Sequence, residues 1–434
     1  MQKAFRASIF HCLDDPGEHA SSSASEFFDD GLLVVEDGAV VGVGPAAKLL
    51  PGLAETVVVE DFSGGIIMPG LIDCHVHYSQ LDIIASYGEQ LLDWLSRYAY
   101  PEEARFADAD HADQVAGAFI DELLRNGTTT ALVFATVHPH SVDSIFTAAA
   151  ARNMRLVAGK VLMDRNCPPE LSDDADSAYA DSKALIERWH GQRRLGYAIT
   201  PRFAVTSTAR QLEAAGRLAA EYPDTWVHTH LAENTDEVDE VARLFPERRS
   251  YLDVYACFGL LRERSVFAHC LHLDEDDRAL LADSGGAAAF CPSSNLFLGS
   301  GLFDLRAMTA AGIPTGLATD VGGGTSLSLL RTMSDAYKVL HLRGQSLPAS
   351  RAFYLATLGA ARALKLDEHI GNFLPGKEAD FIVLDPQGTR LASRRTGIAS
   401  SIDERLFAMM HLGDDRHVLA TYLQGERSTE RARS

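Results

Sequence analysis

Eight short apolar runs, separated by stretches with a helical pattern, constrain the fold of this 434-residue chain more than any other feature. In Asp113–Arg125, for example, apolar residues recur at the three-to-four spacing of an amphipathic helix. Strands that alternate with helices favour a parallel sheet, and eight such units predict a (β/α)₈, TIM-like barrel. The runs are Ile66–His77, Thr129–Thr136, Leu156–Leu162, Leu195–Phe203, Trp226–Glu233, Val266–Leu273, Gly286–Ser293 and Pro314–Asp320.

The two ends of the chain have a different pattern, with short apolar or alternating runs and glycine turns. We therefore predict one small β-sandwich-like domain composed of residues 1–69 and 366–434, with the barrel formed by residues 70–365. The strands expected in this domain are Phe5–Phe10, Gly31–Glu36, Ala39–Val43, Thr56–Phe62, Asp380–Leu384 and Val418–Gln424.

Charge and cysteine usage restrict the partners and the compartment. A formal net charge of -21 argues against nucleic acid or an anionic membrane as the main partner and favours a neutral small molecule. The 6 cysteines form no CxxC pair, which indicates free thiols in a reducing compartment. We expect no signal peptide, and no run reaches the roughly 18 apolar residues of a membrane helix. The predicted location is the cytoplasm.

Four metal-ligand residues stand at or near the ends of predicted strands: His75, His77, His230 and Asp320. Residues two apart in a strand face the same side, so the imidazoles of His75 and His77 converge. An isolated His-x-His pair in a chain with 16 histidines is more often structural. However, barrel active sites lie at the carboxyl ends of the strands, where all four residues fall. Three imidazoles and one carboxylate can hold a divalent metal and leave room for a water, which indicates a hydrolytic metalloenzyme.

The number of metal ions follows from the fourth predicted strand. Leu195–Phe203 contains no lysine, so the modified lysine that bridges two metals in some barrel hydrolases is missing. We therefore predict one ion per chain. Neutral histidines and one carboxylate suit zinc, with iron or manganese as alternatives.

Two further residues are candidates for catalysis. Glu233 follows His230 by three positions and can act as a proton shuttle, or it can cap the next helix. His269 ends another apolar run, and we interpret it as a hydrogen-bond partner of the hydroxide or substrate, with a core residue as the alternative. His228 shares the face of His230 one layer deeper and is interpreted as a core histidine.

A flat-ring binding site is predicted beside the metal. Arg202 and Phe203 end the fourth strand, where the guanidinium can grip carbonyl and ring-nitrogen acceptors while the phenyl ring stacks. Gln80 offers both a donor and an acceptor. The alternatives are a local ion pair for Arg202 and a solvated loop position for Gln80. The long segment Ser79–Phe106, with Trp94, Tyr98 and Tyr100, is predicted to form a lid over the mouth.

These motifs together resemble the amidohydrolase superfamily and, within it, the guanine deaminases. The resemblance spans nearly the whole chain, in the expected order. The metal motifs identify only the superfamily, whereas Gln80, Arg202-Phe203 and the lid point to the narrower group. The matching segments are Pro69–Gln80, Gly88–Leu95, Thr200–Phe203, His230–Asn234, Gly316–Val321 and Gly376–Phe381.

The resemblance implies hydrolytic deamination of guanine to xanthine and ammonia, with a homodimer as the expected assembly. It assigns zinc to His75, His77, His230 and Asp320, and the proton shuttle to Glu233. It also implies catalytic roles for His269 and Asp320. Contacts to the base are implied for Gln80, Arg202, Phe203, His230, His269 and Asp320.

The sequence is also compatible with two other functions. The nearer one is a related deaminase or hydrolase of another flat heterocycle, such as 8-oxoguanine, an adenosine derivative or a triazine. The other is a non-catalytic scaffold on the same fold, although such a protein is expected to have lost ligands that are complete here. The cytidine-type deaminase fold is excluded, because its H-x-E and P-C-x-x-C motifs are absent.

Overall fold

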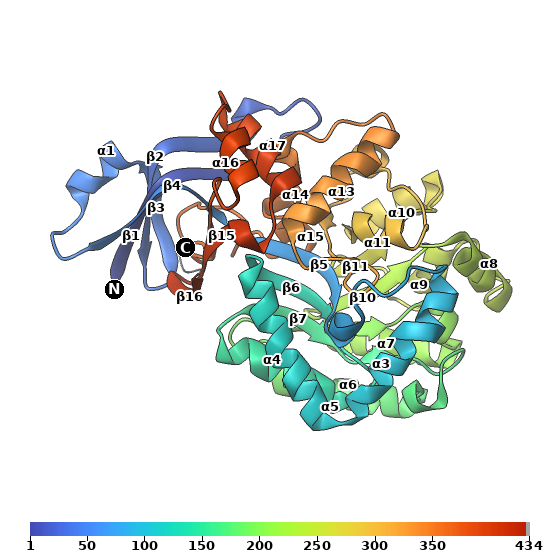
Figure 1. The fold of residues 1–434 in the computed structure, drawn as a ribbon. Coiled ribbons are helices and arrows are strands. Elements are labelled where there is room, and N and C mark those ends of the chain that lie inside the picture. Colours follow the sequence, from blue (N-terminus) through green and yellow to red (C-terminus); the bar gives the residue numbers. More distant parts are fainter. Residues whose placement is uncertain (431–434) are drawn as a thin grey trace. The chain divides into compact units, whose positions relative to one another are not determined.

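The computed structural model describes residues 1–430, and the chain divides into two compact units. One unit contains residues 1–73, 122–130 and 328 onward, and the other contains residues 74–121 and 131–327. Many of their helices and strands are labelled in Figure 1. The predicted domain boundaries at 69/70 and 365/366 stay predictions.

A mixed seven-stranded sheet is built from both ends of the chain, in the order β16-β15-β14-β4-β1-β2-β3. Only β1 and β4 pair in parallel; the other neighbours are antiparallel. Its strands are β1 (Gln2–Cys12), β2 (Ser25–Glu36), β3 (Ala39–Pro45), β4 (Val58–Pro69), β14 (Phe381–Leu384), β15 (Val418–Leu423) and β16 (Glu426–Glu430).

Alternation along β1 gives this sheet two apolar faces. Phe5 lies on one face with Phe381 and Tyr422, whose rings stack with centroids 4.4 Å apart. Ala4 lies in a smaller cluster with Leu32. Because consecutive strand residues point to opposite sides, one apolar segment serves both clusters.

The second sheet is a nearly closed barrel of parallel strands, in the order β13-β12-β11-β10-β9-β7-β6-β5. Figure 1 labels five of these strands: β5, β6, β7, β10 and β11. Hydrogen bonds from Asp320 N to His75 O (2.9 Å) and from His77 N to Val321 O (2.8 Å) link the segment after β13 to β5. The predicted fold class is therefore confirmed. The strands are β5 (Leu71–His77), β6 (Thr128–Phe134), β7 (Arg155–Gly159), β8 (Val161–Leu162), which pairs with β9 (Leu195–Pro201), and β10 (Trp226–Leu231), β11 (Ser265–His269), β12 (Ala287–Phe290) and β13 (Thr315–Leu317).

The prediction of one strand over Ile66–His77 is wrong, since the run divides between the two sheets at Gly70. Pro69 ends β4 opposite Phe381 of the terminal sheet. Leu71 begins β5, and its N–H group donates to Gly127 O at 3.0 Å. A Cβ atom on Gly70 would lie 2.1 Å from Oγ1 of Thr129, so only glycine fits where the chain changes sheets.

Replacing Gly70 by alanine is expected to destabilise the protein by about 2 kcal/mol, because the added methyl group overpacks this junction. Thermal unfolding followed by circular dichroism measures the change in midpoint. Gly117→Ala is the matched control, since a Cβ atom there meets nothing within 4 Å. Equal midpoints for the two variants would contradict the steric explanation for the glycine.

Helices occupy most connections between barrel strands. Several of them begin where a polar side chain accepts a backbone hydrogen bond; for example, Thr208 caps α7, and Asn234 caps α8. No helix within residues 1–430 is long and apolar enough to cross a membrane. The helices are α1 (Ala46–Leu49), α2 (Leu91–Trp94), α3 (Tyr100–Ala104), α4 (Ala109–Arg125), α5 (Pro139–Ala151), α6 (Ala175–Trp189), α7 (Ala209–Glu221), α8 (Thr235–Leu244), α9 (Tyr251–Cys257), α10 (Glu275–Ser284), α11 (Pro292–Phe297), α12 (Leu305–Ala310), α13 (Leu329–Leu342), α14 (Ala349–Leu355), α15 (Leu358–Ala363), α16 (Arg390–Thr396) and α17 (Ile402–Leu412).

Candidate active site

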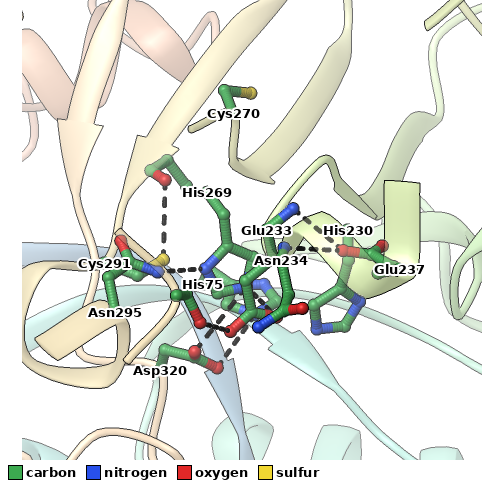
Figure 2. Close-up of polar contacts among 12 residues, drawn as sticks. His75, His230, Glu233, Asn234, Glu237, His269, Cys270, Cys291, Asn295 and Asp320 are labelled. Atoms are coloured by element: carbon green, nitrogen blue, oxygen red, sulfur yellow. Dashed lines mark hydrogen bonds and ion pairs between the residues drawn. The ribbon is translucent and has the colours of Figure 1, made fainter. Parts of the chain in front are cut away.

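The predicted metal ligands meet at the carboxyl ends of three barrel strands. His75 and His77 end β5, His230 lies one residue before the end of β10, and Asp320 follows β13 by three residues. His269, the last residue of β11, joins them. The side chains of His75, His230, His269 and Asp320 point toward one another in Figure 2.

Distances within this group are short enough for several residues to share one ion. His75, His230, His269 and Asp320 each offer a ligand atom, and these atoms all lie within 4.8 Å of one another. His77 Nε2 lies 3.5 Å from Oδ1 of Asp320 and 3.3 Å from Nε2 of His230. The structure therefore gathers the predicted quartet and adds His269 beside it.

The electrostatics of the cluster suit a cation. Burial lowers the pKa of His77 to about 4 and that of His269 to about 3, and it lowers the pKa of His230 well below its ordinary value. Burial acts to raise the pKa of Asp320, but contact with the histidines, His75 first, outweighs it and holds that pKa well below its ordinary value. Neutral imidazoles at these three positions and the ionised Asp320 are donors of the kind that zinc binds.

Hydrogen bonds to backbone and side-chain atoms orient two of the imidazoles. His230 Nδ1 donates to Arg202 O at 2.7 Å, which leaves the lone pair of Nε2 for the cluster. His269 Nδ1 lies 2.8 Å from Nδ2 of Asn295. Figure 2 draws this contact as a dashed line. The buried Nε2 of His269 has no hydrogen bond within the described residues. Both rings thus turn Nε2 toward the shared space.

Glu233 lies at the edge of the metal-ligand cluster with its carboxyl group buried. Its Oε1 accepts from Ser300 Oγ at 3.1 Å, and its Oε2 lies 3.4 Å from His269 Nε2. Burial and the nearby Asp320 raise the pKa of Glu233 well above its ordinary value. The residue that caps α8 is Asn234, with Glu237 completing the capping box. The carboxyl group of Glu233 is therefore available for proton transfer.

A pocket with an empty volume of about 380 Å³ opens beside the cluster, and its lining joins the predicted metal, proton-transfer and ring-binding residues. The predicted lid segment contributes Leu91, Trp94 and Leu95 to the wall. The other lining residues are His77, Gln80, Arg202, Phe203, His230, Glu233, Leu298, Asp320 and Gly323.

The predicted ring-binding residues lie at this pocket with fixed partners. Arg202 Nη1 donates to Oε2 of Glu103 at 2.6 Å, and the guanidinium lies 5.2 Å from the ring centre of Tyr100. Gln80 Nε2 donates to Oε1 of Glu103 at 2.8 Å, while Gln80 Oε1 accepts from Gly322 N at 3.1 Å. The ion pair weighed as an alternative for Arg202 is thus present, within the pocket wall.

Comparison with known proteins fits this geometry. The sequence model of the amidohydrolase family matches residues 66–427, which is most of the chain. The chain belongs to the amidohydrolase family. Members of this family are generally metal-dependent, in agreement with the cluster of histidines and Asp320.

Relatives within the family carry a narrower name. Guanine deaminase of Escherichia coli strain K12 is 50% identical over 432 residues, covering 99% of this chain and 98% of the relative. The structure of E. coli guanine deaminase superposes with a TM-score of 0.97 at 49% identity, covering 99% of this chain and 100% of that one. Guanine deaminase from C. acetobutylicum, described with guanine bound in its active site, gives 0.89 at 28% identity, covering 98% and 100%.

Three residues that contact the predicted site residues were not predicted from the sequence: Glu103, Asn295 and Ser300. Each holds a predicted site residue, through the hydrogen bonds described above. A partial signal for Glu103 was available, since it lies in the predicted lid segment. The adjacent Glu102 has the same side chain, however, and nothing in the sequence distinguishes the two.

Proposed function

We propose that this chain is a guanine deaminase, which hydrolyses guanine to xanthine and ammonia. The observation that carries this proposal is one pocket, in which Gln80, Arg202 and Phe203 face the same space as Glu233 and the metal-ligand cluster. The 50% identity to E. coli guanine deaminase over nearly the whole of both chains supports the same activity.

For the metal we propose zinc, one ion per chain, held by His75, His77, His230 and Asp320. A zinc ion in such a site supplies a water molecule whose pKa is lowered to about 7. The close approach of His77 Nε2 to His230 Nε2, at 3.3 Å, supports this assignment, because two neutral nitrogens gain from sharing a cation.

Proton transfer is assigned to Glu233. We propose that this carboxylate takes a proton from the attacking water and delivers it to N3 of guanine, which makes C2 electrophilic. As the C2–O bond forms, Asp320 and His269 orient the attacking oxygen. Glu233 then carries the proton of the new hydroxyl group to the amine, and the C2–N bond breaks to release ammonia.

The purine ring is held by pocket residues other than the proposed metal ligands. Phe203 is buried and stacks on the face of the purine, while Arg202 and Gln80 donate to its carbonyl and ring-nitrogen acceptors. The lid residues Trp94 and Leu95 line the same pocket and exclude water from it.

Ultraviolet absorbance of the zinc-loaded protein with guanine tests the proposal directly. Adenine, cytosine, 8-oxoguanine and ammeline are run in parallel. Conversion of guanine to xanthine well above the other conversions is expected. Turnover of another ring without turnover of guanine would overturn the substrate assignment and leave the metal site in place.

Replacing Arg202 by lysine is expected to lower kcat/KM for guanine by about 10²-fold, chiefly through KM, because an ammonium group cannot reproduce the planar fork of donors. Steady-state kinetics and zinc content are measured together. Arg105→Lys is the control, since Arg105 is exposed and pairs with Glu102 outside the pocket. A KM for Arg202→Lys equal to that of the control would remove Arg202 from the ring contacts.

The assembly and location implied by the family resemblance stay predictions. We expect a homodimer in the cytoplasm that takes part in purine catabolism. Light scattering of the purified protein measures the mass, and a monomer at micromolar concentration would contradict the dimer.

A further inference from the structure

One buried carboxylate, that of Glu103, joins the two polar residues proposed to hold the purine. Glu103, Arg202 and Gln80 are each no more than 2% exposed. The two carboxyl oxygens are divided between the partners: Oε2 accepts from Arg202 and Oε1 accepts from Gln80, at 2.6 and 2.8 Å. The orientation of both proposed ring contacts therefore depends on a residue that does not itself line the pocket.

The hydrogen bonds fix which atoms Gln80 and Arg202 turn toward a ligand. The amide of Gln80 cannot flip without losing two bonds, since Nε2 faces Glu103 and Oε1 accepts from Gly322 N. Glu103 engages Nη1 of Arg202, so the remaining N–H groups of the fork are left for the ligand. Tyr100, under the guanidinium, supports it from another side.

The same contact sets the charge of this wall. A buried guanidinium without a partner would attract an anion strongly, because a buried charge that lacks compensation is costly. Glu103 compensates Arg202 in an ion pair, so the wall offers N–H donors with little net charge. Such a wall suits the carbonyl and ring nitrogens of a neutral heterocycle better than the anion of a more acidic one.

We propose that Glu103 is a positioning and specificity residue, which aligns Gln80 and Arg202 and makes the pocket favour a neutral purine over an anionic one. This inference rests on the proposed function for its choice of ligands. It has a consequence for turnover, because xanthine loses a proton more readily than guanine does. A charge-balanced wall binds the xanthine anion weakly and so favours release of the product.

The test compares Glu103→Gln with Glu102→Gln. Glu102 is the neighbouring residue of α3, and both of its oxygens accept from Arg105 rather than from a residue of the pocket. For Glu103→Gln we expect kcat/KM for guanine to fall by about 10²-fold, with most of the loss in KM, because the two ring contacts are displaced. Glu102→Gln is expected to keep the kinetics of the unmodified enzyme.

Isothermal titration calorimetry with two purines that do not react separates the effect of Glu103 on the charge of the pocket wall from its effect on the positions of Gln80 and Arg202. At a mildly alkaline pH, xanthine is largely anionic and hypoxanthine largely neutral. The ratio of their dissociation constants is expected to shift toward xanthine by about tenfold or more in Glu103→Gln, because the charge of Arg202 is no longer balanced. Glu103→Asp keeps the charge but shortens the side chain, so we expect it to lose activity on guanine while keeping the wild-type binding ratio.

The outcomes are distinguishable from failure of the proposed function. If the unmodified protein does not deaminate guanine but the binding ratio shifts in Glu103→Gln, the deaminase assignment falls and the role of Glu103 stands. If Glu103→Gln matches Glu102→Gln in both kinetics and binding ratio, the inference is overturned. If Glu103→Gln does not fold, Glu103→Asp still tests the inference: kinetics on guanine equal to those of Glu102→Gln would overturn the positioning role, and a shifted binding ratio would overturn the charge argument.

Discussion

Replacing Glu233 by glutamine is expected to lower kcat for guanine by about 10³-fold while the bound metal stays in place, because an amide cannot accept and return a proton. The amide is nearly the same size and can still accept from Ser300 Oγ, so the pocket keeps its shape. Pre-steady-state and steady-state kinetics measure the loss, and mass spectrometry of the metal measures zinc per chain.

The matched control for this loss is Glu240→Gln on α8. Glu240 carries the same carboxyl group, but it pairs with Arg243 at the surface and lies outside the pocket. Unchanged kinetics in the control and a full zinc content in Glu233→Gln would assign the effect to proton transfer. Turnover by Glu233→Gln within a few-fold of the unmodified enzyme would remove Glu233 from the mechanism.

The barrel and the strand-end histidines were predictable because both depend on local patterns. Apolar runs predict strands. His75, His77 and His230 lie at or near the carboxyl ends of such runs, which places them at the same face of any parallel barrel. Alternation within β5 is a period-two property of the backbone and needs no tertiary information. The sequence therefore predicted that these side chains would meet, before any distance was known.

The sequence predicted a domain boundary at 69/70, but the apolar pattern did not show that the run Ile66–His77 divides into two strands at Gly70. Apolar residues lie on both sides of Gly70, and both halves are strands, so periodicity gives no sign that they belong to different sheets. The decisive contact is with Thr129, which lies 59 positions away in the chain. In the sequence, this steric constraint between distant segments is visible only as a glycine. Glycine also occurs for many other reasons, so its presence does not identify the constraint.

The contacts that orient the site were also beyond the sequence. Arg202 and Glu103 are 99 positions apart, and Asn295 lies 26 positions from His269. Which acid pairs with a buried arginine depends on how the segment Ser79–Phe106 folds, and α3 contains both Glu102 and Glu103. Residue type and spacing predicted the groups that face the ligand, whereas the groups behind them required the fold.

Removing the metal is expected to abolish guanine turnover, and adding zinc back is expected to restore it at one ion per chain. The reason is electrostatic: without a cation, nothing in the cluster lowers the pKa of a bound water molecule, so the residues themselves do not generate a strong nucleophile at neutral pH. Dialysis against a chelator, followed by activity and metal analysis during zinc titration, measures both effects. Full activity in metal-free protein would contradict the proposed chemistry.

A histidine variant locates the ion within the protein. His77→Asn is expected to lower zinc affinity by roughly 10 to 100-fold or more, because it removes a nitrogen 3.5 Å from Oδ1 of Asp320 and 3.3 Å from Nε2 of His230. His19→Asn is the control, since His19 is exposed and far in sequence from the cluster. Unchanged zinc affinity in His77→Asn would instead favour His75, His230, His269 and Asp320 as the ligand set, because their ligand atoms already lie within 4.8 Å of one another. The choice between His77 and His269 therefore decides whether His269 acts as a ligand or as the hydrogen-bond partner of the attacking water.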